Sequence, residues 1–193
     1  MIAKFDLTGE EEVKYSAKLK MAHSNDMTYN SNTKQIIVCH ARGNERGLTI
    51  LNAATLEKVG GKEDIGFAFH GIDYNAANDC YVVYTGSTHY CYILNANFEP
   101  IMKYESKNVR PDVEGTLSPQ GMGCDDKYIY YLYAWSGDAA THEQIISVID
   151  WNGNHITNIR FSFDEEAETI IFMNNKIYVN VLKESKLYEL NIQ

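Results

Sequence analysis

The six histidines are the residues of this sequence best suited to chemistry, because imidazole binds metals, exchanges protons near neutral pH and hydrogen-bonds polar ligands. Five of them fall in segments that we expect to be loops at one end of the fold. These five are His23, His40, His70, His89 and His142. His155 falls in a turn that we expect at the opposite end. The sequence therefore predicts a ligand-binding surface where the five histidines gather.

Other polar and aromatic side chains share the same loops. Asn25 and Asp26 follow His23, Asp73 follows His70, and Arg42 and Trp135 belong to two further loops. An exposed Trp beside carboxylates, amides and Arg is typical of a surface that binds a sugar or a small polar ligand. Alternatively, Asp26 and Asp73 hydrogen-bond neighbouring sheets, and Trp135 covers a sheet edge. The predicted ligand-binding residues are His23, Asn25, Asp26, His40, Arg42, His70, Asp73, His89, Trp135 and His142.

Signatures of catalysis are absent from the sequence. There is no G-x-S-x-G, phosphate-binding loop, G-x-G-x-x-G or H-E-x-x-H motif, and no two of the four cysteines form a C-x-x-C pair. We therefore predict no catalytic residue, no cofactor and no resident metal, and expect the cysteines to be small buried apolar residues. The alternative is a metal-assisted hydrolase or lyase in which His23, Asp26, His70 and Asp73 converge in a central channel.

A repeat positions these residues. Residues 27–39 (MTYNSNTKQIIVC) align without gaps with residues 72–84 (IDYNAANDCYVVY), and shorter copies occupy 122–133 and 170–182. Each copy reads as two apolar strands joined by a turn of Asn, Asp or Lys, which indicates a β-hairpin. A second hairpin pattern follows at 48–59, 92–104 and 148–161, opens the chain at Lys4 and closes it from Lys186 without a return strand.

Two hairpins in succession make one four-stranded unit, and the inner strands recur every 45 to 50 residues. This spacing is typical of the blades of a β-propeller, so we predict an all-β propeller of four-stranded antiparallel blades. The competing interpretation is a β-sandwich or barrel. We expect one domain over residues 1–193, with a half blade at 1–20, blades at 21–63, 64–108 and 109–163, and a partial blade at 164–193.

The strand count leaves two ways to arrange the ring. Residues 11–19 supply the missing outer strand beside residues 187–192, which closes a ring of about four blades and leaves residues 2–7 over. Alternatively, the chain is part of a propeller with five or more blades, and a missing segment or a second copy supplies the rest. Because an open sheet edge tends to pair with another chain, this arrangement implies a homo-oligomer or a partner chain.

Composition excludes several classes of function. The net charge is −9, with 26 acidic and 17 basic residues, and no run of Lys and Arg is longer than a pair. Nucleic-acid binding needs a basic face, so we expect no nucleic-acid partner. No apolar stretch approaches the ~20 residues that span a bilayer, so we expect no membrane insertion. The start of the chain lacks the features of a signal peptide, which indicates a cytoplasmic protein or a trimmed or non-classically exported surface protein.

One segment resembles a known group of proteins. Residues 22–38 (AHSNDMTYNSNTKQIIV), with an echo at 70–75 (HGIDYN), are similar to the His-x-Asn-Asp-Met-Thr-Tyr-Asn segment of bacterial propellers related to the helveticin-J-like bacteriocins, and to cell-surface and prophage-associated proteins. The resemblance implies a bacterial or phage-borne protein with a target at the cell envelope. The matching residues are His23, Asn25, Asp26, Tyr29 and Asn30.

These observations favour a non-enzymatic binding module that recognises a carbohydrate, a cell-wall polymer or a protein through the loops at one end of the propeller. The metal-assisted hydrolase or lyase is the second hypothesis. The third is a purely structural subunit whose open blade is completed by a partner chain.

Overall fold

The structure is a computed structural model, and it describes residues 1–4, 13–19, 21, 23–40, 46–85, 90–105, 117–135, 142–173, 176–181 and 186–191. All regular secondary structure in these residues is β-strand. None of the described residues belongs to a helix that could cross a membrane.

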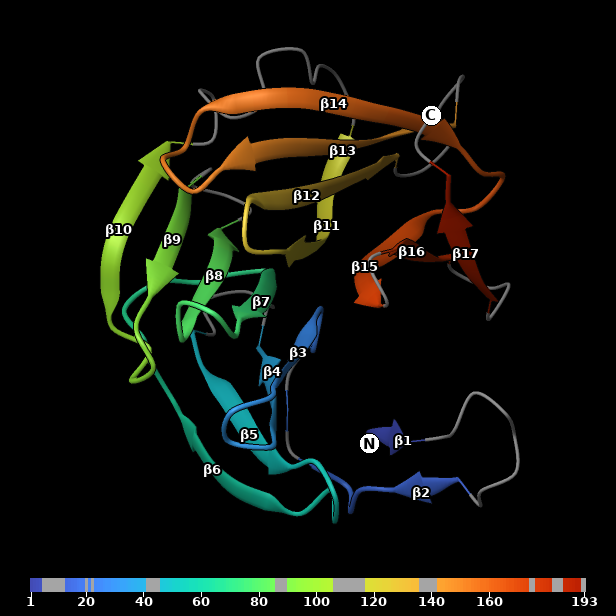
Figure 1. The fold of residues 1–193 in the computed structure, drawn as a ribbon. Helices are drawn as coiled ribbons and strands as arrows, with labels where there is room; N and C mark the ends of the chain where they lie inside the picture. Colours follow the sequence, from blue (N-terminus) through green and yellow to red (C-terminus); the bar gives the residue numbers. More distant parts are fainter. Residues whose placement is uncertain are drawn as a thin grey trace.

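The strands form the blades of a β-propeller (Figure 1). The first blade contains β3 (Met27–Asn30), β4 (Gln35–Cys39), β5 (Leu48–Asn52) and β6 (Lys58–Lys62). The second contains β7 (Gly71–Asn75), β8 (Cys80–Thr85), β9 (Tyr90–Leu94) and β10 (Pro100–Glu105). The third contains β11 (Leu117–Cys124), β12 (Tyr128–Trp135), β13 (Glu143–Asp150) and β14 (His155–Ser162), and the fourth contains β15 (Ala167–Met173), β16 (Lys176–Val181) and β17 (Lys186–Leu190). The predicted fold class is therefore confirmed.

Every blade is an antiparallel meander in which the strands follow chain order from the axis outward. The inner strands β3, β7, β11 and β15 lie around the axis, each against the next in chain order (Figure 1). Each inner strand begins at the end of the propeller where the second strand finishes and the third begins. We call this end, which collects the connections between blades, the top end. Residues far apart in the sequence meet there because the topology brings every inner strand to it.

The turns between the first two strands of each blade explain the recurring Asn and Asp. The side-chain oxygen of Asn30 accepts hydrogen bonds from the backbone N–H groups of Asn32 and Thr33, both at 2.9 Å. In the third blade, Asp125 accepts from the N–H groups of Lys127 and Tyr128, both at 2.7 Å. A short side chain with an accepting oxygen thus supplies the bonds that a tight turn leaves unmade.

The core lies between the blades. Apolar residues on facing sheets form one cluster between each successive pair of blades, including Ile37 with Ile72, Tyr84 with Tyr131, and Leu132 with Val179. All four cysteines are buried and free. The chain therefore stabilises its blades by face-to-face packing of aromatic and branched side chains.

The N-terminal segment does not close the ring in the way that one sequence interpretation proposed. β2 (Lys14–Tyr15) pairs with β1 (Ala3–Lys4), whereas among the described strands β17 pairs with β16 alone. Residues 187–191 are therefore not paired with residues 13–19, and residues 2–4 are not left over. Ile2 instead packs against Val38 and Leu51 on the face of the first blade that points away from the second. Figure 1 shows this hairpin beside the first blade and apart from β17.

Candidate functional site

Asp26 lies at the axis and joins all four blades. Its Oδ1 accepts hydrogen bonds from the N–H of Met27 at 2.9 Å and the hydroxyl of Thr169 at 3.2 Å. Its Oδ2 accepts from the N–H groups of Ile72 at 3.1 Å and Met122 at 3.3 Å. These donors belong to β3, β15, β7 and β11, so one carboxylate contacts every inner strand.

Burial of this carboxylate raises its pKa from 3.8 to about 8, although the backbone donors oppose the shift and Asp73 adds to it. Burial favours the neutral form because a carboxylate loses its hydration, whereas donors favour the charged form. Asp26 is therefore a structural centre whose own acceptor sites are already occupied by the protein.

Asp73 makes a second, smaller junction on the axis. Its Oδ1 accepts from the hydroxyl of Thr28 at 2.7 Å, and its Oδ2 accepts from the N–H of Cys124 at 2.7 Å. Burial raises the pKa of Asp73 as well. Both aspartates thus form hydrogen bonds between blades, as the second of the two interpretations of the sequence proposed. Their contact with a ligand stays a prediction.

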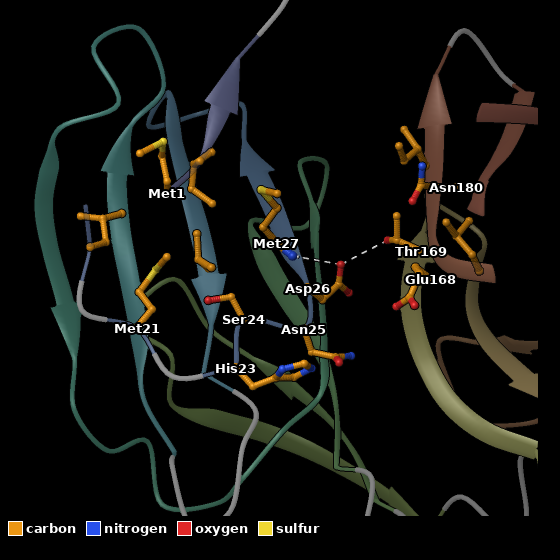
Figure 2. A pocket seen from close by; sticks show the side chains of 15 residues that line it. Met1, Met21, His23, Ser24, Asn25, Asp26, Met27, Glu168, Thr169 and Asn180 are labelled. Atoms are coloured by element: carbon orange, nitrogen blue, oxygen red, sulfur yellow. Dashed lines mark hydrogen bonds between the residues drawn. The ribbon is translucent and has the colours of Figure 1, made fainter. Parts of the chain in front are cut away.

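A cavity of about 680 Å³ opens beside Asp26, between the first and fourth blades. His23, Ser24 and Asn25 line one side, and Glu168 lines the other from the start of β15. Figure 2 shows the Asp26–Thr169 hydrogen bond crossing the cavity, with His23 and Asn25 facing Glu168 across it. The remaining lining is mainly apolar and includes Met1, Ile2, Leu19, Met21, Met27, Val38, Ile170 and Ile171.

The polar residues on the rim of this cavity interact with the second and fourth blades. The side-chain amide of Asn25 donates to the backbone oxygen of His70 at 3.0 Å. Burial lowers the pKa of His70, and the nearby His23 lowers it further. Burial raises the pKa of Glu168, Glu166 adds to this, and His23 opposes it. The cavity mouth therefore holds imidazole and carboxylate groups that influence one another, a pattern associated with functional sites.

The other predicted residues lie elsewhere. His40 directly follows β4, and its Nε2 is 3.0 Å from the hydroxyl of Thr49, in a polar cavity of about 690 Å³ that also includes the Arg46–Asp64 ion pair. His142 precedes β13, with its Nδ1 4.0 Å from Asp164. Both histidines are at the top end, but away from the axis. Trp135 is the last residue of β12, whereas Arg42 and His89 lie outside the described residues.

Glu168 and Thr169 were missed by the sequence analysis. The acidic run at 164–168 has the composition of a solvated loop, so its residue types alone do not indicate a site. The available signal was its position in the repeat: Glu168 lies two residues before the copy at 170–182, as His70 lies two residues before the copy at 72–84. A metal site at the axis finds no support in the described ranges, which contain no cluster of three or more His, Cys, Asp or Glu side chains able to hold an ion.

Comparison with known proteins adds information on the fold. No protein-family model matches the chain, and no curated protein matches it significantly. A solved structure of glutaminyl cyclase from Myxococcus xanthus is similar, with a TM-score of 0.60 and 10% identity over 88% of this chain and 66% of that one. A protein of unknown function from Bacteroides caccae aligns with a TM-score of 0.47 and 12% identity, over 81% of this chain and 54% of the other.

The chain thus spans less than two thirds of each of these two solved structures. At these identities the likeness concerns the fold alone. The four blades of this chain are a β-propeller with the fold also seen in the Myxococcus enzyme.

Proposed function

We propose that this chain is a non-enzymatic binding module, and that its ligand enters the cavity beside Asp26 from the top end. The observation that supports this most is that His23 and Glu168, far apart in the sequence, line opposite sides of one cavity. Glu168 is half-buried and exposed to the cavity, so its carboxylate can accept hydrogen bonds from a ligand, whereas the carboxylate of Asp26 is already occupied.

The charge of the site indicates the kind of ligand. Glu168 brings a carboxylate to the cavity, Glu166 lies close enough to raise its pKa while accepting a hydrogen bond from Gln120, and the chain carries a net charge of −9. An ammonium group on the ligand would neutralise this charge and form a charge-assisted hydrogen bond with the carboxylate of Glu168. Of the ligand classes predicted from the sequence, we favour a carbohydrate or cell-wall polymer that bears free amines. Asn25 and Ser24 would hydrogen-bond its hydroxyl groups.

The resemblance of residues 22–38 to helveticin-J-like propellers agrees with this choice, because those proteins imply a target at the cell envelope. His23, Asn25 and Asp26 belong to the resembling segment and also line the cavity. A bacterial origin and an envelope target are therefore part of the proposal.

Glu168→Gln is expected to weaken binding of a glucosamine hexamer about tenfold at neutral pH, since loss of one charged hydrogen bond costs about 1.5 kcal/mol or more. Isothermal titration calorimetry measures this directly. Because the pKa of Glu168 is raised, wild-type affinity is expected to fall as the pH decreases and the carboxylate becomes protonated.

Glu57→Gln is the matched control, because Glu57 lies in an exposed turn at the opposite end of the first blade. This variant should bind like the wild type, and a fully N-acetylated hexamer should bind weakly to all three proteins. Equal affinity of the wild type and the Glu168→Gln variant for the glucosamine hexamer would refute the proposed ligand contact.

The metal-assisted hydrolase or lyase remains the second hypothesis, and it is not favoured. The similar glutaminyl cyclase is an enzyme, but the likeness at 10% identity extends to the fold and not to the chemistry. Asp26 and Asp73, two of the four side chains that this hypothesis needs, already accept hydrogen bonds from inner strands.

A further inference from the structure

The first and fourth blades face each other across an open sector of the ring, and their facing surfaces are incompletely covered. Met27 and Tyr29 on β3 are 51% and 49% exposed. The residues at the same positions of the repeat in the second blade, Ile72 and Tyr74, are 1% and 7% exposed because the first blade covers them. The first blade has no described blade on its corresponding side, only the β1–β2 hairpin.

The fourth blade presents a similar surface from the other side. Ile171 lines the cavity beside Asp26 and is 39% exposed. Asn180 lines the same cavity and is directly opposite Leu187, which is 38% exposed, so both lie on one face of the sheet. Beyond β17, the described residues contain no fourth strand, whereas each of the first three blades has one.

The strand order shows which strands would complete the ring beside the described residues of the fourth blade. The β1–β2 hairpin has the sequence pattern of the outer two strands of a blade, and it packs on the first blade through Ile2, Leu19 and Met21. An outer strand for the fourth blade, followed by the inner two strands of a further blade, would occupy the space between β17 and β1. About a third of the similar glutaminyl cyclase chain, which has the same fold, likewise has no counterpart in these four blades.

We propose that the open sector is a strand-acceptor site for a polypeptide, which pairs with the outer edge of β17 and covers the apolar surface made by Met27, Tyr29 and Ile171. The occupant is a polypeptide with alternating apolar residues, since only extended strands satisfy both the sheet edge and this surface. A second copy of the chain is a poor occupant. Its described residues lack the same strands, and its β1–β2 hairpin has only two residues in each strand and packs on its own first blade.

A synthetic peptide that copies residues 99–135 provides a suitable probe, because it holds an outer strand followed by two inner strands in the required order. Added to the full chain, it should slow hydrogen exchange of the β17 amides about fivefold or more. The peptide should also slow oxidation of Met27 in the protein. Met102 of the protein, which is 46% exposed on the outer strand β10, should be oxidised at an unchanged rate.

The control is the same peptide carrying Met102→Pro and Tyr131→Pro, since proline cannot continue a strand ladder. Protection by the original peptide alone supports the strand-acceptor site. Unchanged exchange at β17 and unchanged oxidation of Met27 would overturn it. Protection that grows with protein concentration in the absence of peptide would also overturn it, because a second copy would then be the occupant.

Discussion

Replacing Asp26 with asparagine is expected to lower the free energy of unfolding by about 1–3 kcal/mol at about pH 4, where the folded chain holds this carboxyl protonated, because at least one buried N–H group loses its acceptor. Each carboxylate oxygen of Asp26 accepts two hydrogen bonds. In asparagine one of these oxygens becomes an amide nitrogen, which donates and cannot accept. Chemical denaturation followed by tryptophan fluorescence measures the loss.

The same variant should also change how stability depends on pH. The pKa of Asp26 is about 8 in the folded chain and near 3.8 in the unfolded chain, so between these values the folded state holds a proton that the unfolded state has released. The contribution of Asp26 is therefore fully present below pH 3.8 and is lost as the pH rises toward 8. Between these two pKa values, Asp26 makes the free energy of unfolding fall by up to about 1.4 kcal/mol per pH unit. The asparagine variant should lack this pH dependence.

Asp126→Asn serves as the control for both measurements, because Asp126 is exposed in the turn that follows β11. This variant should unfold like the wild type and keep the wild-type pH slope. If Asp26→Asn unfolds at the wild-type denaturant concentration at about pH 4, the axial carboxyl group does not join the four inner strands.

Adding a methyl group at Gly121 is expected to cost about 3 kcal/mol of stability, at the upper end for overpacking, because the new carbon meets backbone. A Cβ at this position would lie 2.6 Å from the Cα and 2.7 Å from the hydroxyl of Thr169, and 2.9 Å from the backbone oxygen of Glu168. Neither backbone atom can turn away as a flexible side chain would. Relief requires β11 and β15 to separate, which also weakens the hydrogen bond from Thr169 to Asp26.

Gly60→Ala gives the matched comparison on the outer strand β6. A Cβ at Gly60 would meet only the side chain of Ile50, at an ordinary 3.7 Å. Thermal unfolding should therefore show a clear loss for Gly121→Ala and little change for Gly60→Ala. Equal melting temperatures for the two variants would mean that the third and fourth blades are not in close contact at the axis.

The blades could be predicted from the sequence because each hairpin is specified locally. Asn30 and Asp125 make the turns through their own side chains, and the apolar strands on either side pair with near neighbours. The role of Asp26 in all four blades depends on inner strands meeting at an axis, and no local pattern carries that information. The two aspartates could be identified as inter-blade groups, but their partners could not.

The N-terminal strand shows a further limit. Pairing residues 11–19 with residues 187–192 satisfied the strand count, but the chain forms the nearby hairpin of β1 and β2 instead. A local hairpin needs far less loop closure than a contact between the ends of the chain, so its entropic cost is lower. Glu168 was overlooked for a related reason: its acidic neighbours resemble a solvated loop, and only the fold places it opposite His23.

Nuclear magnetic resonance titration of His70 and Glu168, in the wild type and in His23→Gln, tests most directly whether three blades share one site at the top end. His23 lowers the pKa of both groups, so we expect both pKa values to rise in the variant. His155→Gln, altered at the opposite end, should leave both values unchanged. If neither pKa moves when His23 is replaced, residues 23, 70 and 168 do not share a site, and the proposed binding surface is contradicted.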